Sequence, residues 1–172
     1  SPSQAKWIWL PAGRTLPNTF ALFRFEFDLT DAPGSFPGWI CADSRYELRV
    51  NGRRVQWGPA PSDPRMMEAD PFDLAPYLKA GRNCIAVRVL YYGFSEGTWA
   101  FGKPGLILWD DSQVLASGAH WKCLLDRSQP PGQAPRWYLR ALQEQRDHRL
   151  EPLGWDLPGY NDFHWLDAKV LS

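Results

Sequence analysis

The sequence lacks any long apolar run, and none reaches the length of about eighteen residues that a membrane-spanning helix needs. It also lacks net charge, because 19 basic residues balance 19 acidic ones. Proteins that bind nucleic acid or anionic membranes by electrostatic attraction usually carry a basic excess. We therefore expect no nucleic acid and no membrane as partner, and a neutral chain suits an uncharged partner.

Cysteine is scarce, and its pattern excludes two common uses. Cys41, Cys84 and Cys123 are odd in number and far apart, which fits neither a zinc site nor a disulfide framework. Each lies beside apolar residues, so we expect buried, reduced thiols, which favour a cytoplasmic location. No signal peptide is present, but the chain begins Ser-Pro-Ser. We therefore expect a piece of a longer protein, from which a signal peptide could have been removed.

Hydrophobic residues, by contrast, are plentiful. They make up 44% of the 172 residues and include ten Trp, nine Phe and six Tyr. This supply is ample for a buried core and argues against disorder. The length suits one domain over 1–172.

Alternation of apolar and polar residues predicts several strands. In 22–29 the odd-numbered positions are apolar, whereas Arg24, Glu26 and Asp28 face the other way, which predicts a half-buried strand with one wet face. Residues 46–50 repeat the pattern. Asn51-Gly52 then supplies the two residues that best tolerate positive φ, and the chain returns, so this stretch predicts a hairpin.

Further segments complete an all-β pattern. Strands are expected at 83–93 and 105–109, and after a turn capped by Asp110 and Asp111 the chain continues through 114–117 to a strand near 120–125. The stretch Leu74 to Lys79 predicts a short helical turn with Asp73 as its N-cap and Gly81 as its stop. Strands about ten residues apart predict an antiparallel β-sandwich. Residues 138–150 fit either a helix or a strand.

Two irregular loops lie between these strands, at 57–72 and 93–104. Proline bars both from central strands, and Gly and Pro give them fixed paths. Proteins hold a sugar with a flat aromatic ring against its C–H face and with side chains that hydrogen bond to its hydroxyls. We predict carbohydrate binding by residues of these loops and their edges: Trp57, Arg65, Tyr91, Tyr92, Glu96 and Trp99. The aromatic ones could instead pack beneath their loops or against a neighbouring domain.

No catalytic constellation stands out. Glycoside hydrolysis needs two carboxylates about 5–10 Å apart. The candidate carboxylates have structural roles: Asp43 is expected to begin a strand, Asp73 to cap a turn, and Asp162 to lie in a turn. Histidines are isolated, and no metal-ligand spacing or phosphate-binding glycine loop is found. We expect no catalytic residue, no metal site and no cofactor.

Five segments carry a family resemblance when they are taken in order. They read AKWIWLP, FRFEF, ADSRYELRVNGRRVQWGP, DPFDLAPYLKAGRNCIAVRV and RLEPLGWDLPGYNDFHWLDAKVL. Together they resemble the N-terminal, non-catalytic β-sandwich region of bacterial α-L-rhamnosidases of glycoside hydrolase family 78. More broadly, they are similar to galactose-binding-like, jelly-roll domains of large glycoside hydrolases.

The C-terminal part of the chain adds a degraded motif. Rhamnosidases carry a segment similar to Gly-Glu-x-Tyr-Asp-Ala-Arg, followed by Gly-Trp and by an acidic pair before a Trp. The matching positions are Glu144, Asp147, Arg149, Gly154-Trp155, Asn161-Asp162 and Trp165, and the departures are Gln143, Arg146 and His148. The match favours a strand over a helix for about 144–150.

The resemblance implies a function without chemistry of its own. In that family the reaction takes place in a separate α-helical barrel, and nothing of this barrel is present. The chain is therefore expected to be an accessory domain of a rhamnosidase-like enzyme, with carbohydrate, such as a rhamnose-containing glycan, and other domains of the same polypeptide as partners. The alternatives are a stand-alone carbohydrate-binding module and a purely structural spacer.

Overall fold

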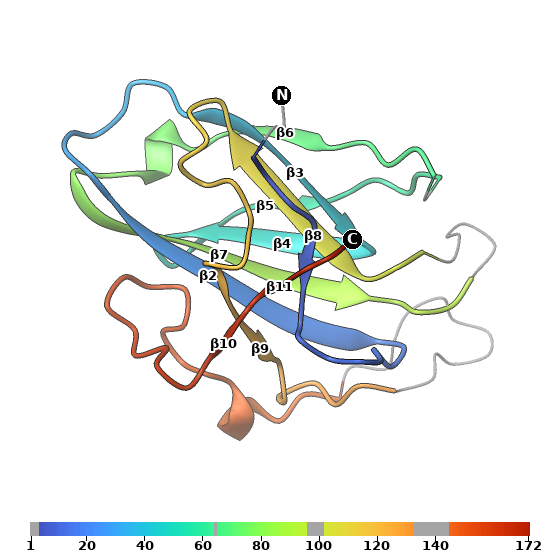
Figure 1. The fold of residues 1–172 in the computed structure, drawn as a ribbon. Coiled ribbons are helices and arrows are strands. Elements are labelled where there is room, and N and C mark those ends of the chain that lie inside the picture. Colours follow the sequence, from blue (N-terminus) through green and yellow to red (C-terminus); the bar gives the residue numbers. More distant parts are fainter. Residues whose placement is uncertain (1–3, 64, 96–101, 133–144) are drawn as a thin grey trace.

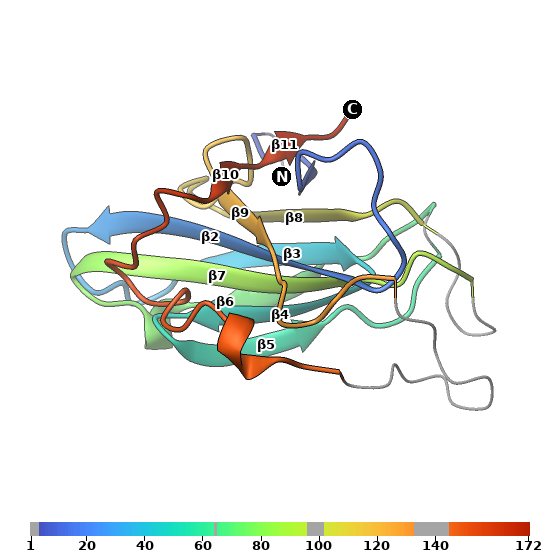
Figure 2. The ribbon, with the colours of Figure 1, turned by 90° about the horizontal axis from the view of Figure 1, so that it is seen from below.

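The structure, a computed structural model, describes residues 4–63, 65–95, 102–132 and 145–172. Two antiparallel sheets pack face to face (Figures 1 and 2), which confirms the predicted all-β sandwich. Their strand orders are β11-β1-β8-β3-β6 and β10-β9-β2-β7-β4-β5. The elements are β1 (Ile8–Trp9), β2 (Thr19–Leu29), β3 (Pro37–Asp43), β4 (Arg45–Val50), β5 (Arg53–Gly58), β6 (Asp70–Asp73), the 3-10 turn η1 (Ala75–Tyr77), β7 (Gly81–Tyr91), β8 (Gly105–Asp110), β9 (Lys122–Leu125), the 3-10 turn η2 (His148–Leu150), β10 (Leu166–Asp167) and β11 (Lys169–Val170).

The core lies between the two sheets. Strands β2 and β7 pair along their full length and carry Phe23 and Val87 inward, where they are fully buried. Ile40 on β3 and Leu108 on β8 face them from the other sheet and are equally buried. The inward half of each alternating pattern therefore behaves as the sequence predicts.

The predicted hairpin is β4–β5, and its turn has the predicted chemistry. Asn51 and Gly52 have φ values of 48° and 84°, the left-handed region that Asn and Gly tolerate best. The Asn51 amide also donates to the carbonyl oxygen of Tyr77 at 3.0 Å, and its oxygen accepts from the backbone N–H of Cys84 at 2.9 Å. These bonds fix the hairpin turn against β7 and against the 3-10 turn η1.

The short helical turn is present as η1, but it spans only Ala75–Tyr77 and its N-cap residue is Leu74, so the predicted bounds and the predicted Asp73 cap position were wrong. Asp73 accepts hydrogen bonds from the backbone N–H groups of Ala75 at 3.0 Å and Phe36 at 2.8 Å, and these bonds lower the pKa of its carboxyl. Gly81 follows with a φ of 86°.

Within the described ranges, no helix has the length and apolar composition needed to cross a bilayer.

The outer face of β2 is covered at Leu22 and Arg24 but open at Asp28, whose side chain is 67% exposed, so the predicted wet face is present only at the end of the strand. Arg24 is only 1% exposed. Its guanidinium donates to the carbonyl oxygens of Trp155 at 2.8 Å and Leu157 at 3.0 Å, and it pairs with Asp162 and with Glu26. Residues 151–165, which we call the covering segment, lie over this part of the sheet. Local alternation cannot reveal a cover that comes from more than a hundred positions away.

Other corrections concern segment boundaries. Strand β5 continues through Gly58 and β6 covers 70–73, so the irregular loop is shorter than 57–72. Residues 114–117, which the sequence left unassigned between two strands, form a loop, and the Asp110 carboxylate holds it by accepting from the backbone N–H of Leu115 at 2.7 Å. Asp43 ends a strand rather than beginning one.

The strand predicted for 144–150 is also absent over its described part, 145–150. Residues 145–147 are irregular, and η2 follows. Asp147 accepts from the backbone N–H of Arg149 at 3.1 Å, as a helix N-cap does. The local cap decides the conformation here, and the family motif misled the prediction.

The cysteines are free and buried, as predicted. Cys41, Cys84 and Cys123 lie in β3, β7 and β9. Burial raises the pKa of each thiol to about 12. The thiols are therefore neutral at physiological pH, which makes them poor nucleophiles.

Candidate functional site

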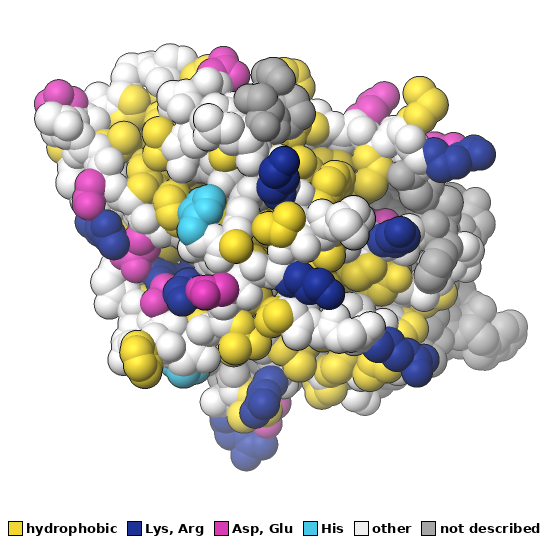
Figure 3. Space-filling model, viewed as in Figure 1, with side chains coloured by type: hydrophobic (Ala, Val, Ile, Leu, Met, Phe, Trp, Pro, Cys, Tyr) yellow, Lys and Arg dark blue, Asp and Glu magenta, His cyan; other side chains and the backbone are white. Residues whose placement is uncertain are grey.

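The candidate sites are hollows in the surface, because no large patch of one charge marks a site on the face that Figure 3 shows. On the face seen in Figure 3, basic, acidic and hydrophobic side chains are interspersed. Two hollows contain residues that the sequence analysis singled out, and we name them the Trp57 hollow and the Trp7 hollow. The Trp57 hollow has a volume of about 400 Å³ and is lined by Phe20, Arg45, Tyr46, Glu47, Arg54, Trp57, Arg88, Leu90, Tyr92 and Gln129.

Strand register builds the Trp57 hollow on the outer face of the six-stranded sheet. Glu47 on β4 lies opposite Trp57 on β5 and opposite Arg88 on β7. Side chains in such a row point to the same face of a sheet. One row away, Arg45 lies opposite Leu90. The hollow is therefore the outward half of the same alternation that buries Leu48 and Val87 on the inner side.

An exposed aromatic ring forms one wall of this hollow. Trp57 is 66% exposed, although a ring of this size is usually buried. The Arg54 guanidinium lies over the indole, 5.1 Å from its centroid, and 3.8 Å from the Glu47 carboxylate. Glu47 also accepts from Arg49 at 2.8 Å. The polar groups beside the ring are thus held in place by one another.

The floor of the hollow is fixed by a second set of ion pairs. Arg88 lies 3.2 Å from Glu151 and 3.4 Å from the fully buried Asp126. Burial alone would raise the pKa of Glu151, but its contacts with His148, Arg146 and Arg88 lower it overall. Glu151 is therefore an anion that holds Arg88 in one orientation.

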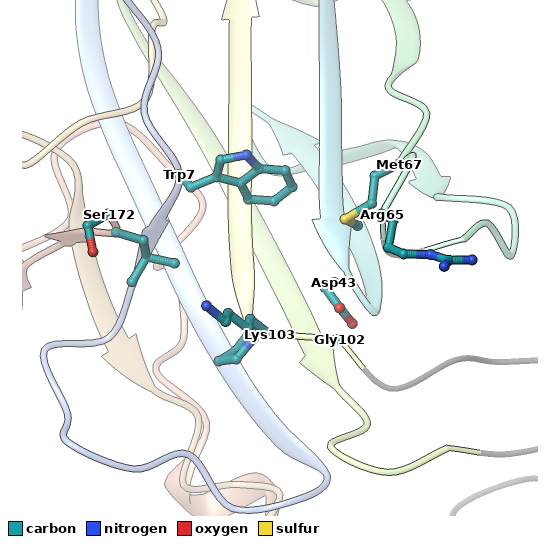
Figure 4. Close-up of a pocket in the computed structure, with 9 residues that line it drawn as sticks. Trp7, Asp43, Arg65, Met67, Gly102, Lys103 and Ser172 are labelled. Atoms are coloured by element: carbon teal, nitrogen blue, oxygen red, sulfur yellow. The ribbon is translucent and has the colours of Figure 1, made fainter.

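The Trp7 hollow lies at another place, between the chain ends and the loop after β5 (Figure 4). Its volume is about 710 Å³, and it is lined by Trp7, Asp43, Arg65, Met67, Gly102, Lys103, Pro104, Leu171 and Ser172. Asp43 is 4% exposed and accepts from the Ser44 hydroxyl at 2.7 Å. Burial raises the pKa of the Asp43 carboxyl. This hollow combines an indole wall with a carboxyl acceptor.

The structure separates the predicted carbohydrate-binding residues. Trp57 and Tyr92 line the same hollow, whereas Arg65 lies at the Trp7 hollow and pairs with Asp63 at 2.7 Å. Tyr91 is buried: its ring lies edge-on to that of Trp9, and its hydroxyl donates to the carbonyl oxygen of Gly102 at 3.0 Å. Glu96 and Trp99 lie outside the described residues.

Sequence reasoning missed most of the polar residues of both hollows. Glu47 and Arg88 were visible as outward positions of predicted strands, and pairing the hairpin strands would have placed Trp57 beside Glu47. Asp43 and Lys103 carried no such signal, because they come together only when the strand ends meet. Among the described residues, no group of three or more His, Cys, Asp or Glu side chains is placed to hold a metal ion.

Comparison with solved structures identifies the fold. No protein-family profile and no curated protein sequence matches the chain. A family 78 rhamnosidase of Bacillus sp. GL1 matches 98% of the chain with 32% identity and a TM-score of 0.90, and the chain spans 18% of it. An α-L-rhamnosidase from Dictyoglomus thermophilum matches 98% with 20% identity and a TM-score of 0.74, over 21% of its length.

A lectin from Pleurotus ostreatus also has this fold. It matches 98% of the chain with 21% identity and a TM-score of 0.62, over 41% of its own length. Over nearly its whole length the chain is therefore similar to a β-sandwich region of family 78 α-L-rhamnosidases, which confirms the resemblance that its sequence motifs carry, and it has the fold of a carbohydrate-binding or accessory domain.

Proposed function

We propose that the chain is a non-catalytic accessory domain, formed by residues 1–172, that binds carbohydrate at the Trp57 hollow. The observation that carries this proposal is the 66% exposed Trp57 beside charged groups that are already fixed by ion pairs. Tryptophan and arginine are enriched among the residues that contribute most of the binding energy at interfaces. The ring offers an apolar face, and its neighbours offer hydrogen-bond donors and acceptors.

Carbohydrate fits this arrangement better than a charged ligand does. A sugar needs a flat apolar wall for its C–H face and oriented polar groups for its hydroxyls. Glu47 is already paired with Arg49 and Arg54, and Arg88 is paired with Glu151 and Asp126. The site therefore presents both signs in fixed positions. The similarity to rhamnosidase chains and to a lectin supports the same class of ligand.

Titration calorimetry with rhamnose, galactose and oligosaccharides that contain them tests the proposal. We expect heat of binding with at least one of these sugars and loss of that heat in Trp57→Ala. Trp39→Ala is the matched control, because Trp39 is 39% exposed on the other sheet and lines neither hollow. Flat titrations across the panel, or equal loss in both variants, would contradict the proposal.

The absence of catalysis is tested separately. Asp70 accepts from the Tyr46 hydroxyl at 2.6 Å, and Asp162 pairs with the buried Arg24, so both carboxylates have structural partners. We expect the purified chain to release no chromophore from an aryl α-L-rhamnoside. Turnover that follows the purified chain through a second chromatographic step would contradict a purely accessory role.

A second function, packing against other domains of the same polypeptide, has its own observation. The covering segment exposes Phe163 to 92% and Leu153 to 81%. Exposed apolar side chains of this size suit a domain interface. We expect hydrogen exchange of 150–165 to slow when the chain is part of its full-length polypeptide. Equal exchange in the isolated chain and in the full-length polypeptide would contradict this second function.

A further inference from the structure

A third hollow adjoins the Trp57 hollow on the same face of the sheet. It has a volume of about 400 Å³ and is lined by Glu47, Arg49, Arg88, Arg146, Glu151, Pro152, Leu153, Gly154, Trp155 and Asp156. Glu47 and Arg88 line both hollows. The two spaces therefore meet at this pair of side chains, which come from neighbouring strands at directly opposite positions.

The two hollows follow one direction along the sheet. Outward-facing residues of β4 succeed one another from Arg45 through Glu47 to Arg49, and the first two line the Trp57 hollow while the last two line the third. The four residue steps from Arg45 to Arg49 correspond to about 13 Å at the usual rise of about 3.3 Å per residue. This length exceeds what a single sugar ring occupies.

The two hollows differ in the chemistry of their walls. Trp57, which lies in the same row as Glu47 and Arg88, supplies an aromatic face to the Trp57 hollow only. In the third hollow Arg49 donates to Asp156 at 2.6 Å, and Arg146 pairs with Glu151, which comes from the covering segment. The third hollow therefore has few apolar surfaces but many fixed donors and acceptors.

We propose that the two hollows form one groove that binds an extended neutral oligosaccharide, with one ring on Trp57 and the next ring held by hydrogen bonds in the third hollow. This inference rests on the proposed carbohydrate binding and adds that the ligand is a chain of sugars rather than a single ring. The charged groups suit hydroxyls because each arginine in the third hollow already has a carboxylate partner. A free anion would have to compete with those carboxylates.

The experiment compares ligand length. Calorimetry is run with methyl α-L-rhamnoside and with rhamnose oligomers of two and three rings, and again with galactose and β-1,4-linked galactose oligomers of two and three rings. A second ring that gains hydrogen bonds to charged groups raises affinity by about tenfold. We therefore expect this gain between one and two rings in the series that binds.

Two variants locate the rings. Trp57→Ala should abolish binding at every length. Arg146→Gln should remove the gain from the second ring and leave the affinity for one ring unchanged. Arg82→Gln is the matched control, because Arg82 pairs with Asp28 at an exposed position outside both hollows. Thermal melting of each variant establishes that it is folded.

The outcomes separate the two proposals. Affinity that is equal for one, two and three rings overturns the groove but leaves carbohydrate binding at Trp57 intact. Equal weakening of one-ring and two-ring binding by Arg146→Gln also overturns the groove. Tighter binding of a galacturonate dimer than of the neutral dimers would contradict the proposal that the groove binds a neutral oligosaccharide. No binding of any sugar in either series overturns the groove and the proposed function together.

Discussion

The outer face of the six-stranded sheet has two halves that differ in what lies over them. Over β2 and part of β7, the covering segment buries Leu22, Arg24, Cys84 and Ala86 beneath Trp155 and Trp165. Over β4 and β5, Arg54 and Trp57 remain exposed. Both halves arise from the same alternation of strand residues. We call them the covered half and the open half.

Each half contains an arginine beside an aromatic ring, and comparing the two pairs shows how the covering segment changes the exposure of the arginine. Arg24 lies 5.4 Å from the centroid of Tyr160 and is 1% exposed, whereas Arg54 lies 5.1 Å from that of Trp57 and its side chain is 58% exposed. At the buried arginine no water can replace a lost partner, so removing one partner is costly. The exposed pair is free to exchange water for a ligand.

Breaking the covered half at its centre should have the largest effect. Arg24→Met removes the guanidinium that pairs with Asp162 and Glu26 and donates to two carbonyl oxygens, and Glu26 keeps only Gly159 and Arg82 as partners. Removing one partner of a buried ion pair costs about 3–5 kcal/mol of unfolding free energy. Guanidinium chloride denaturation measures the loss. Arg82→Met, which removes a 54% exposed arginine that pairs with Asp28 and lies 3.5 Å from Glu26, should cost less than about 1 kcal/mol. Equal losses of unfolding free energy in the two variants would show that the contacts of Arg24 with the covering segment do not stabilise the fold.

A milder change in the covered half removes one partner from the covering segment. Asp162→Ala deletes a carboxylate that Arg24 contacts but leaves Glu26 in place. A hydrogen bond to a charged group is worth about 2 kcal/mol, so we expect a loss of this size in the same denaturation assay. Asp28→Ala, at the exposed pair, is the control. A loss no larger than in that control would argue that the covering segment is held by its tryptophans alone.

The third prediction uses the thiol beneath the cover. Burial raises the pKa of Cys84 to about 12, against an ordinary value of 9.0. Its stabilising effect is therefore complete below pH 9 and is lost as the pH rises from 9 to 12, because only the unfolded thiol ionises there. Cys84→Ala removes the sulfur and should cost about 1 kcal/mol at pH 7. The stability difference between the two proteins should narrow above pH 9, as measured by denaturation at successive pH values. A constant difference would contradict burial of the thiol.

The smallest effect on stability is expected in the open half. Trp57→Ala removes a ring that is already in water, so the unfolding free energy should change by no more than about 0.5 kcal/mol. The same variant should lose carbohydrate binding, as proposed above. Denaturation and calorimetry on one preparation measure both quantities. A large loss of stability would mean that Trp57 is a structural residue and that side chains of the open half stabilise the fold as those of the covered half do.

Much of the fold could be predicted because it depends on neighbours in sequence. Alternation in 22–29 and 46–50 predicts strands, Asn51-Gly52 predicts the hairpin turn, and Asp73 predicts the following helical turn; the structure contains all of these. Less of the candidate site could be predicted from the sequence. Trp57 and Tyr92 were predicted and do line the same hollow, but Tyr91 is a core residue. Whether an aromatic side chain at the end of a strand points into the core or outward depends on its contacts with the opposite sheet.

The sequence by itself determined which residues alternate and where the chain turns, because side-chain period and backbone φ are local properties. Only the tertiary structure decided which outward-facing residues meet water. Arg24 and Arg54 occupy similar local patterns, and the covering segment reaches the first from a position 138 residues away at Asp162 but leaves the second open. Burial depends on contacts between distant parts of the chain, and no local pattern encodes them.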